Sequence, residues 1–182
     1  MAGHSAAAIA HAGNNPFLRI VATISTLAGW CSAAMVVAAV VITCQMIFVR
    51  LVLNASTVWQ TEAVIYLVIA ATLVGLPYVQ RLRGHVNVDL FPLSLALRPR
   101  FLMACLTLSV SILIVAMLLF YGFEFWYLAW SRGWTSDTVW GVRLWIPYLS
   151  IPVGFGLFLL QLVADLVAVV TGIDKPFGLE DK

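Results

Sequence analysis

The most informative cluster of ionisable residues is the charged turn 81–89, which reads Arg-Leu-Arg-Gly-His-Val-Asn-Val-Asp. An arginine in such a turn can form a geometrically specific pair with a carboxylate. The histidine is either a pH-responsive group or a hydrogen-bonded structural side chain. The turn lies between two long apolar segments, and little else in the chain is polar enough to carry chemistry. The placement of the few charges is therefore the main guide to function.

The sequence lacks the residues that enzyme catalysis or cofactor binding would need. The cysteines Cys31, Cys44 and Cys105 form no CxxC pattern and are expected to be small buried hydrophobic residues. All the histidines fall outside the long apolar segments, so none is placed to be an axial ligand of a membrane haem. No Ser/His/Asp set, zinc-type cluster or phosphate-binding glycine loop occurs. We therefore expect no catalytic residue, metal or cofactor in this chain.

The composition is that of a membrane protein. Of 182 residues, 63% are hydrophobic and 10% charged, and the mean hydropathy is +1.01. A soluble domain is roughly half apolar and about a quarter charged. The net charge of +2 is too small to predict nucleic-acid binding.

Four apolar runs are each longer than the roughly 20 residues that cross a hydrocarbon core. Each is predicted to be a helix, because lipid offers no partner for an open backbone amide. The predicted fold class is thus all-α, with an integral membrane domain over 17–172. An N-terminal tail, 1–16, precedes this domain and a C-terminal tail, 173–182, follows it. No cleavable signal peptide is evident. The predicted spans are 17–49, 58–80, 101–130 and 144–171.

Local signals refine three of these elements. Ser56 or Thr57 is expected to cap the second span, and Glu62 either complements the helix dipole there or is a buried acid paired across an interface. Asp89 is expected to cap a short interfacial helix, 89–97, between spans two and three. Prolines are expected to kink the fourth span near its start.

The basic residues predict the orientation. With four spans both ends of the chain lie on one side, and that side holds seven of the ten lysines and arginines. The positive-inside rule therefore places both ends in the cytoplasm. Tryptophans fit this frame, because indoles prefer the headgroup boundary and all but one lie near the predicted outer ends of spans. Those near the outer ends are Trp59, Trp126, Trp130, Trp134, Trp140 and Trp145.

No charged residue lies at mid-depth in any predicted span. Glu62, Glu124 and Asp165 all lie within about two turns of a boundary. A charge at the centre of the bilayer costs a few kcal/mol or more and is usually kept there only for function. The sequence therefore predicts a helical body that completes another protein rather than one that grips a solute itself.

Two groups of residues carry a resemblance to a known family. The first runs from Trp59-x-x-Glu62 through Gly75 to the turn 81–89, and the second contains Trp-Ile-Pro at 145–147, Ile-Pro-Val-Gly at 151–154 and Gln-Leu-Val at 161–163. The pattern resembles the small, DctQ-like membrane subunit of tripartite ATP-independent periplasmic (TRAP) transporters. The resemblance covers about residues 17–172.

The resemblance implies a multi-pass protein of the bacterial inner membrane that pairs with a large membrane subunit. That subunit would carry the substrate and sodium sites, and a periplasmic binding protein would deliver an organic acid. The small subunit would extend the scaffold and help dock the binding protein. Membrane lipids are further expected partners, including lipid bound between the subunits, whereas nucleic acid is not.

Carried over to this sequence, the resemblance implies two candidate surfaces. The hypothetical large-subunit interface comprises Glu62, Arg81, Arg83, His85 and Asp89. The hypothetical docking face for the binding protein comprises Arg50, Arg132, Trp134, Asp137 and Arg143. Ordinary anchoring at the membrane boundary is the alternative for the second set.

Two other functions stay open at this point. One is a stand-alone small transporter that works as a homodimer, although a proton-coupled example would need an acid in mid-span. The other is an accessory subunit of a membrane redox complex, which the missing haem and thiol ligands disfavour.

Overall fold

The computed structural model describes residues 15–82 and 97–173, and in these ranges the protein is helical. Its elements are α2 (Pro16–Val52), α3 (Val58–Arg81), α5 (Leu97–Ser131), α6 (Trp145–Tyr148) and α7 (Ser150–Val170). Four of the resulting helical stretches, with α6 and α7 taken together, are long and apolar enough to cross a membrane. The prediction of an all-α protein with four such segments is therefore confirmed. The predicted interfacial helix before Leu97 lies outside the described residues.

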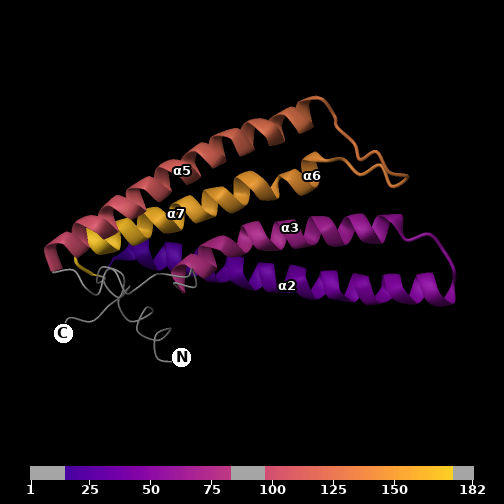
Figure 1. Ribbon diagram of the computed structural model, residues 1–182, viewed down its shortest axis with the longest axis horizontal. Coiled ribbons are helices and arrows are strands. Elements are labelled where there is room, and N and C mark those ends of the chain that lie inside the picture. The colour runs from indigo at the N-terminus through magenta and orange to yellow at the C-terminus, as the bar shows by residue number, and fades with distance from the viewer. Residues whose placement is uncertain (1–14, 83–96, 174–182) are drawn as a thin grey trace.

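The helices form two hairpins that pack side by side (Figure 1). Helix α3 packs against α2 and α7, and α5 packs against α7. We call the end with Pro16, Arg81, Leu97 and Val170 the terminal end, and the opposite end, where α2 turns into α3, the loop end. Helix α7 is central, because it packs against α2, α3 and α5.

The close approach of α3 and α7 depends on a proline and a glycine, two residue types that are unfavourable inside a helix. Pro77 lies inside α3 and has no N–H to offer the carbonyl of Leu73, one turn earlier. Gly154 of α7 packs against Leu73 at this level, so that a Cβ on Gly154 would lie 2.8 Å from the Leu73 carbonyl oxygen. Only a residue without a side chain allows the two backbones to come this close.

A second close contact joins α2 to α3. The Tyr78 ring lies over Gly29, where a Cβ would approach the ring to 2.4 Å. Nearby, the Ser32 hydroxyl donates to the backbone carbonyl of Ala71 at 2.6 Å, and Gly75 leaves room for the serine. Small residues and an interhelical hydrogen bond, the usual means of helix association in lipid, therefore hold this pair together.

The fourth span is divided near the prolines that were expected to kink it. It divides at Leu149 into α6 and α7, although the Leu149 N–H still bonds the carbonyl of Trp145. Pro152 cannot donate to the carbonyl one turn before it, and the Ser150 hydroxyl donates to the carbonyl of Pro147 at 2.7 Å. Backbone hydrogen bonds thus continue across the division, and α6 and α7 together form one span.

Candidate functional site

Polar side chains of the described bundle gather at its two ends. At the terminal end, Gln161 of α7 lies at the centre of a buried chain of hydrogen bonds. Its Oε1 accepts from the Ser25 hydroxyl of α2 at 2.6 Å, and its Nε2 donates to Asp165 at 2.7 Å. Asp165 also accepts from Nε2 of Gln80 on α3, at 2.8 Å. We call these four residues the terminal-end network; it fixes three helices relative to one another.

Arg81 adds a second link at the same end. Its guanidinium donates to the backbone carbonyl of Ala22 at 2.7 Å and to the hydroxyl of Thr26. Both acceptors are on α2, so the arginine joins the last turn of α3 to the first third of α2. A cation at a helix C-terminus also complements the helix dipole.

At the loop end, Glu62 of α3 joins the loop that connects α5 to α6. Its Oε1 accepts from the Ser136 hydroxyl at 2.7 Å, and the Ser136 and Thr138 hydroxyls are 3.2 Å apart. The other carboxylate oxygen of Glu62 is buried and has no hydrogen-bond donor in the part of the chain that the structure describes. An orphan carboxylate oxygen in a buried position is costly, which marks Glu62 for closer attention.

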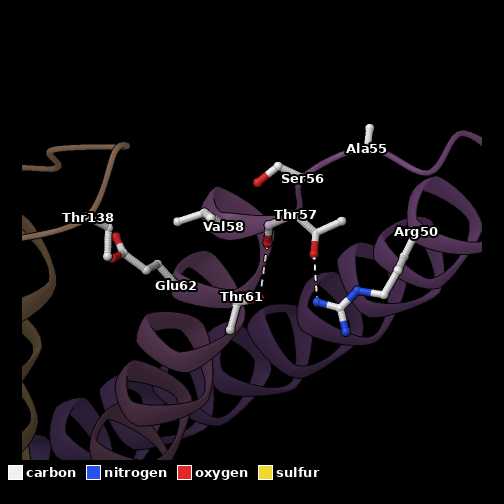
Figure 2. Close-up of a pocket in the computed structure, with 8 residues that line it drawn as sticks. All are labelled: Arg50, Ala55, Ser56, Thr57, Val58, Thr61, Glu62 and Thr138. Carbon is white, nitrogen blue, oxygen red and sulfur yellow. Dashed lines mark hydrogen bonds between the residues drawn. The ribbon is translucent and has the colours of Figure 1, made fainter.

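Glu62 also lines a pocket of about 370 Å³ at the loop end, which Figure 2 shows. Arg50, at the end of α2, lines the same pocket and donates to the Thr57 hydroxyl at 3.0 Å. Thr57 precedes α3 at its N-cap position, but its side chain makes no capping hydrogen bond. The prediction of Ser56 or Thr57 as the cap is therefore confirmed in position for Thr57, whose hydroxyl accepts from Arg50 and forms no capping hydrogen bond. The remaining lining residues are Ala55, Ser56, Val58, Thr61 and Thr138.

The residues proposed from the sequence are distributed over both ends. Glu62 and Arg81 lie 19 residues apart on α3 and are therefore about 28 Å apart along its axis, so they are not parts of one local cluster. Three other residues of that set, Arg83, His85 and Asp89, lie outside the described residues. The proposed docking residues other than Arg50 all lie in the loop 132–144: Arg132, Trp134, Asp137 and Arg143.

This loop has a defined conformation. Thr135 and Arg143 form an isolated antiparallel bridge, and the backbone N–H of Leu144 donates to the carbonyl of Trp134 at 2.9 Å. The loop turns back through Gly141, whose φ of +60° suits glycine. The charged side chains of Arg132, Asp137 and Arg143 are exposed on it. The loop is thus a folded surface that can present charges to a partner.

The comparison with protein families decides the identity of the chain. The family described as "Tripartite ATP-independent periplasmic transporters, DctQ component" matches residues 39–172. This chain belongs to the DctQ family. Neither the curated proteins nor the solved structures contain a match. Because DctQ proteins are transporter components and not enzymes, and four helices can cross a membrane, the chain is a multi-pass membrane component of a transporter.

Within 15–82 and 97–173, no three His, Cys, Asp or Glu side chains come together in a way that could hold a metal ion. Cys31 and Cys44, expected to be buried, are instead exposed on the surface of α2, and Cys105 is intermediate. On a spanning helix, an exposed position is compatible with a small apolar side chain because lipid or a partner covers it.

The terminal-end network of this DctQ protein was not predicted from the sequence. A signal was present, because Gln161 and Asp165 are one helical turn apart and therefore share a face of α7. Their partners Ser25 and Gln80 lie in other helices, and no spacing along the chain relates them.

All the tryptophans of the DctQ chain except Trp30 lie toward the loop end. Trp126 and Trp130 of α5 stack with their ring centroids 5.6 Å apart, and the rings of Trp59 and Trp140 are 6.3 Å apart. The Trp126 indole N–H donates to the carbonyl of Trp145 at 3.1 Å, which ties α5 to α6. Part of this aromatic belt therefore also holds the loop end together.

Proposed function

We propose that this DctQ chain is the small scaffold subunit of a TRAP transporter in the bacterial inner membrane. It pairs with a large membrane subunit that holds the substrate and sodium sites, and it helps to dock a periplasmic binding protein that delivers an organic acid. Both ends of the chain lie in the cytoplasm, so the loop end faces the periplasm. Family membership supports this assignment.

The observation that carries the proposal is the position of the charged residues in the described helices. Each lies within about two turns of a helix end, and Glu62, Arg81 and Asp165 are hydrogen-bonded there to neighbouring parts of this same chain. Charged residues kept inside the membrane typically mark substrate and ion pathways. Since this chain uses its polar groups to join its own helices, the substrate and sodium sites belong to the partner subunit.

The folded loop 132–144 supports the docking role. It exposes two arginines and one aspartate at the end of the bundle that faces the periplasm in the proposed orientation. Charged residues at the rim of an interface mainly steer association and fix the register of the partners. Arg50 lies at the margin of this docking face, next to apolar side chains of the membrane surface.

The large-subunit interface is proposed to include both ends of α3, through Glu62 and Arg81, and the turn with Arg83, His85 and Asp89. Both α2 and α5 also present exposed apolar side chains, including Trp30 of α2, which is 73% exposed. An apolar helical surface of this kind can be covered by another membrane subunit or by lipid.

Reconstitution tests the assignment. Vesicles that contain this chain alone are expected to show no sodium-driven uptake of organic anions. Vesicles that contain this chain, the large subunit and the binding protein are expected to show uptake. In the same preparations, Arg83→Ala or Asp89→Ala is expected to lower the recovery of the large subunit with this chain. Sodium-driven accumulation by this chain alone would overturn the proposal, and full recovery of the large subunit with unchanged uptake would remove those two residues from the interface.

A further inference from the structure

One charged side chain of a spanning helix does not help to join the helices of this chain. Glu124 of α5 is exposed and takes part in no hydrogen bond or ion pair with any residue that the structure describes. The acids Glu62 and Asp165, by contrast, are hydrogen-bonded to other parts of the bundle. An ionisable side chain inside a membrane is costly unless it has a partner, and no described residue supplies one for Glu124.

Glu124 faces away from the bundle. The inward side of α5 includes Gly122, where a Cβ would meet Ile151 of α7 at 2.7 Å, and the fully buried Ala129. Successive residues of a helix are about 100° apart around its axis. Glu124 follows Gly122 by two residues, so it lies about 200° from that contact, on the opposite side of the helix. Its side chain is therefore directed to the outside of the molecule and cannot line a path between α5 and α7.

Glu124 also lies below the aromatic belt. It is about 10 Å from the end of α5 at Ser131, and Trp126 and Trp130, whose indoles prefer the headgroup boundary, lie between it and that end. In an α-helix each Cα–Cβ bond tilts toward the N-terminus of the helix. Helix α5 begins at Leu97, at the terminal end, so the Glu124 side chain leans away from the loop end and deeper into the membrane (Figure 1). The carboxylate is thus directed away from the nearer headgroups.

The packing of the neighbouring helices indicates the same depth. Gly122 is in contact with Ile151 of α7, and Gly154, about one turn farther along α7, packs against Leu73 of α3. Helix α3 has 24 residues and is about 36 Å long, little more than the roughly 30 Å of a hydrocarbon core. Glu124 is therefore level with the interior of α3 and not with its end, although it is only about two turns from the end of its own helix.

The surface around Glu124 is largely aromatic. Phe120, Tyr121 and Tyr127, one turn before and one turn after it, are 68%, 60% and 53% exposed. The Phe120 and Tyr121 rings meet edge to face with their centroids 5.5 Å apart. Aromatic side chains are enriched at the centres of protein interfaces, where they exclude water from the groups that they surround. These three residues and Glu124, which we call the Glu124 face, therefore suit a protein partner that carries a cation.

A second copy of this chain has no such cation at the right depth among the described residues. Every arginine in the described helices lies within about one turn of a helix end, and Arg132 and Arg143 are in the loop 132–144. In a copy with the same membrane orientation these arginines lie near the membrane boundaries, whereas Glu124 lies inside. A lipid headgroup also carries its ammonium at the boundary. These positions favour a cation on a spanning segment of a different protein.

We propose that the Glu124 face contacts a spanning helix of the large membrane subunit, and that the Glu124 carboxylate pairs there with a lysine or arginine of that helix. This contact rests on the proposed function, and it specifies which surface of α5 meets the large subunit and through which chemistry. Little water competes inside the membrane, so a charge-assisted hydrogen bond there is strong and geometrically specific. Phe120, Tyr121 and Tyr127 shield the pair from lipid.

Binding of the two purified membrane subunits in detergent, without the binding protein, tests the pair. Glu124→Gln keeps the shape of the side chain but removes its charge, and it is expected to raise the dissociation constant about tenfold, the effect of one hydrogen bond to a charged group. Asp137→Asn, an exposed acid of the loop 132–144, is the matched control and is expected to bind as the wild type does. Equal dissociation constants for the wild type and Glu124→Gln, or an equal loss in Asp137→Asn, would overturn the inference and leave the proposed function standing. Failure of the wild type to bind the large subunit would overturn both.

Cross-linking identifies the opposite side chain. Tyr121→benzoylphenylalanine keeps an aromatic ring one turn from Glu124, and on illumination of the complex it is expected to cross-link to a segment of the large subunit that contains a lysine or arginine. Changing that basic residue to glutamate is expected to weaken the complex, and combining the change with Glu124→Lys is expected to restore it. Cross-links only to a second copy of this chain, or only to lipid, would overturn the inference. A double variant that binds no more tightly than either single variant would overturn it as well.

Discussion

The packing of Gly154 against α3 makes a quantitative prediction about the stability of the bundle. In Gly154→Ala the new Cβ would lie 2.7 Å from the Leu73 Cβ and 2.8 Å from the Leu73 carbonyl oxygen. Ordinary van der Waals contact begins at 3.4 Å, so the two helices must separate by about 0.7 Å at this level. The obstacle is backbone, which cannot rotate away as a long side chain could.

Gly156→Ala is the matched control. It lies on the same helix, but its Cβ would meet only the end of the Leu119 side chain, at 3.9 Å. Both substitutions gain the same helix propensity, about 1 kcal/mol. The difference between them therefore isolates the packing cost, which for an overfilled interior is about 1–3 kcal/mol. At 25 °C this corresponds to a factor of roughly 5 to 150 in the folding equilibrium.

Unfolding in mixed micelles measures this difference. The two purified variants are titrated from a mild non-ionic detergent toward sodium dodecyl sulfate, and the loss of helix packing is followed by circular dichroism and tryptophan fluorescence. Gly154→Ala is expected to unfold at a lower dodecyl sulfate fraction than Gly156→Ala. Coincident curves would refute the argument that α3 and α7 are held at backbone contact by Gly154.

Three further predictions concern both ends of the bundle. Ser25→Ala removes the hydroxyl that donates to buried Gln161 at 2.6 Å. In the same titration it is expected to lower the free energy of unfolding by about 0.6–1.7 kcal/mol, and no change would mean that this hydrogen bond contributes nothing. Trp126→Phe removes the N–H that ties α5 to α6 at 3.1 Å and is expected to speed proteolysis of the adjoining loop, whereas an unaltered cleavage rate would contradict that role. Arg132→Glu combined with Arg143→Glu is expected to weaken uptake at low binding-protein concentration while the membrane subunits stay associated, and unchanged uptake would count against the docking face.

The sequence was sufficient to predict the helical spans. The predicted span 58–80 corresponds to α3, Val58–Arg81, and the predicted span 144–171 corresponds to α6 and α7 together. The physical reason is that a lipid-spanning backbone must bond to itself, so an apolar run of sufficient length has one available structure. The turn motif at 81–89 led to the DctQ family, which the family comparison confirmed.

The roles of individual polar residues could be predicted only in part. Glu62 was expected either to complement the helix dipole or to be a buried acid, and the structure gives it a partner in Ser136, which is 74 residues away along the chain. Ser56 or Thr57 was expected to cap α3, and Thr57 is the N-cap residue, but its hydroxyl accepts from Arg50 at the end of α2 and forms no capping hydrogen bond. Local rules describe a residue and its neighbours in one helix, and they do not include a competitor from another.

What the sequence alone determined is therefore the set of helices, their lengths and the absence of charge from the middle of each, because these depend on single segments and their solvent. The tertiary structure decided which helices meet and how closely. It brings Gly154 against the Leu73 carbonyl next to Pro77, joins Ser25 to Gln161, and places Arg50 and Glu62 around one pocket. These contacts arise from the fit between surfaces of different helices, which is a property of the packed bundle and not of any one segment.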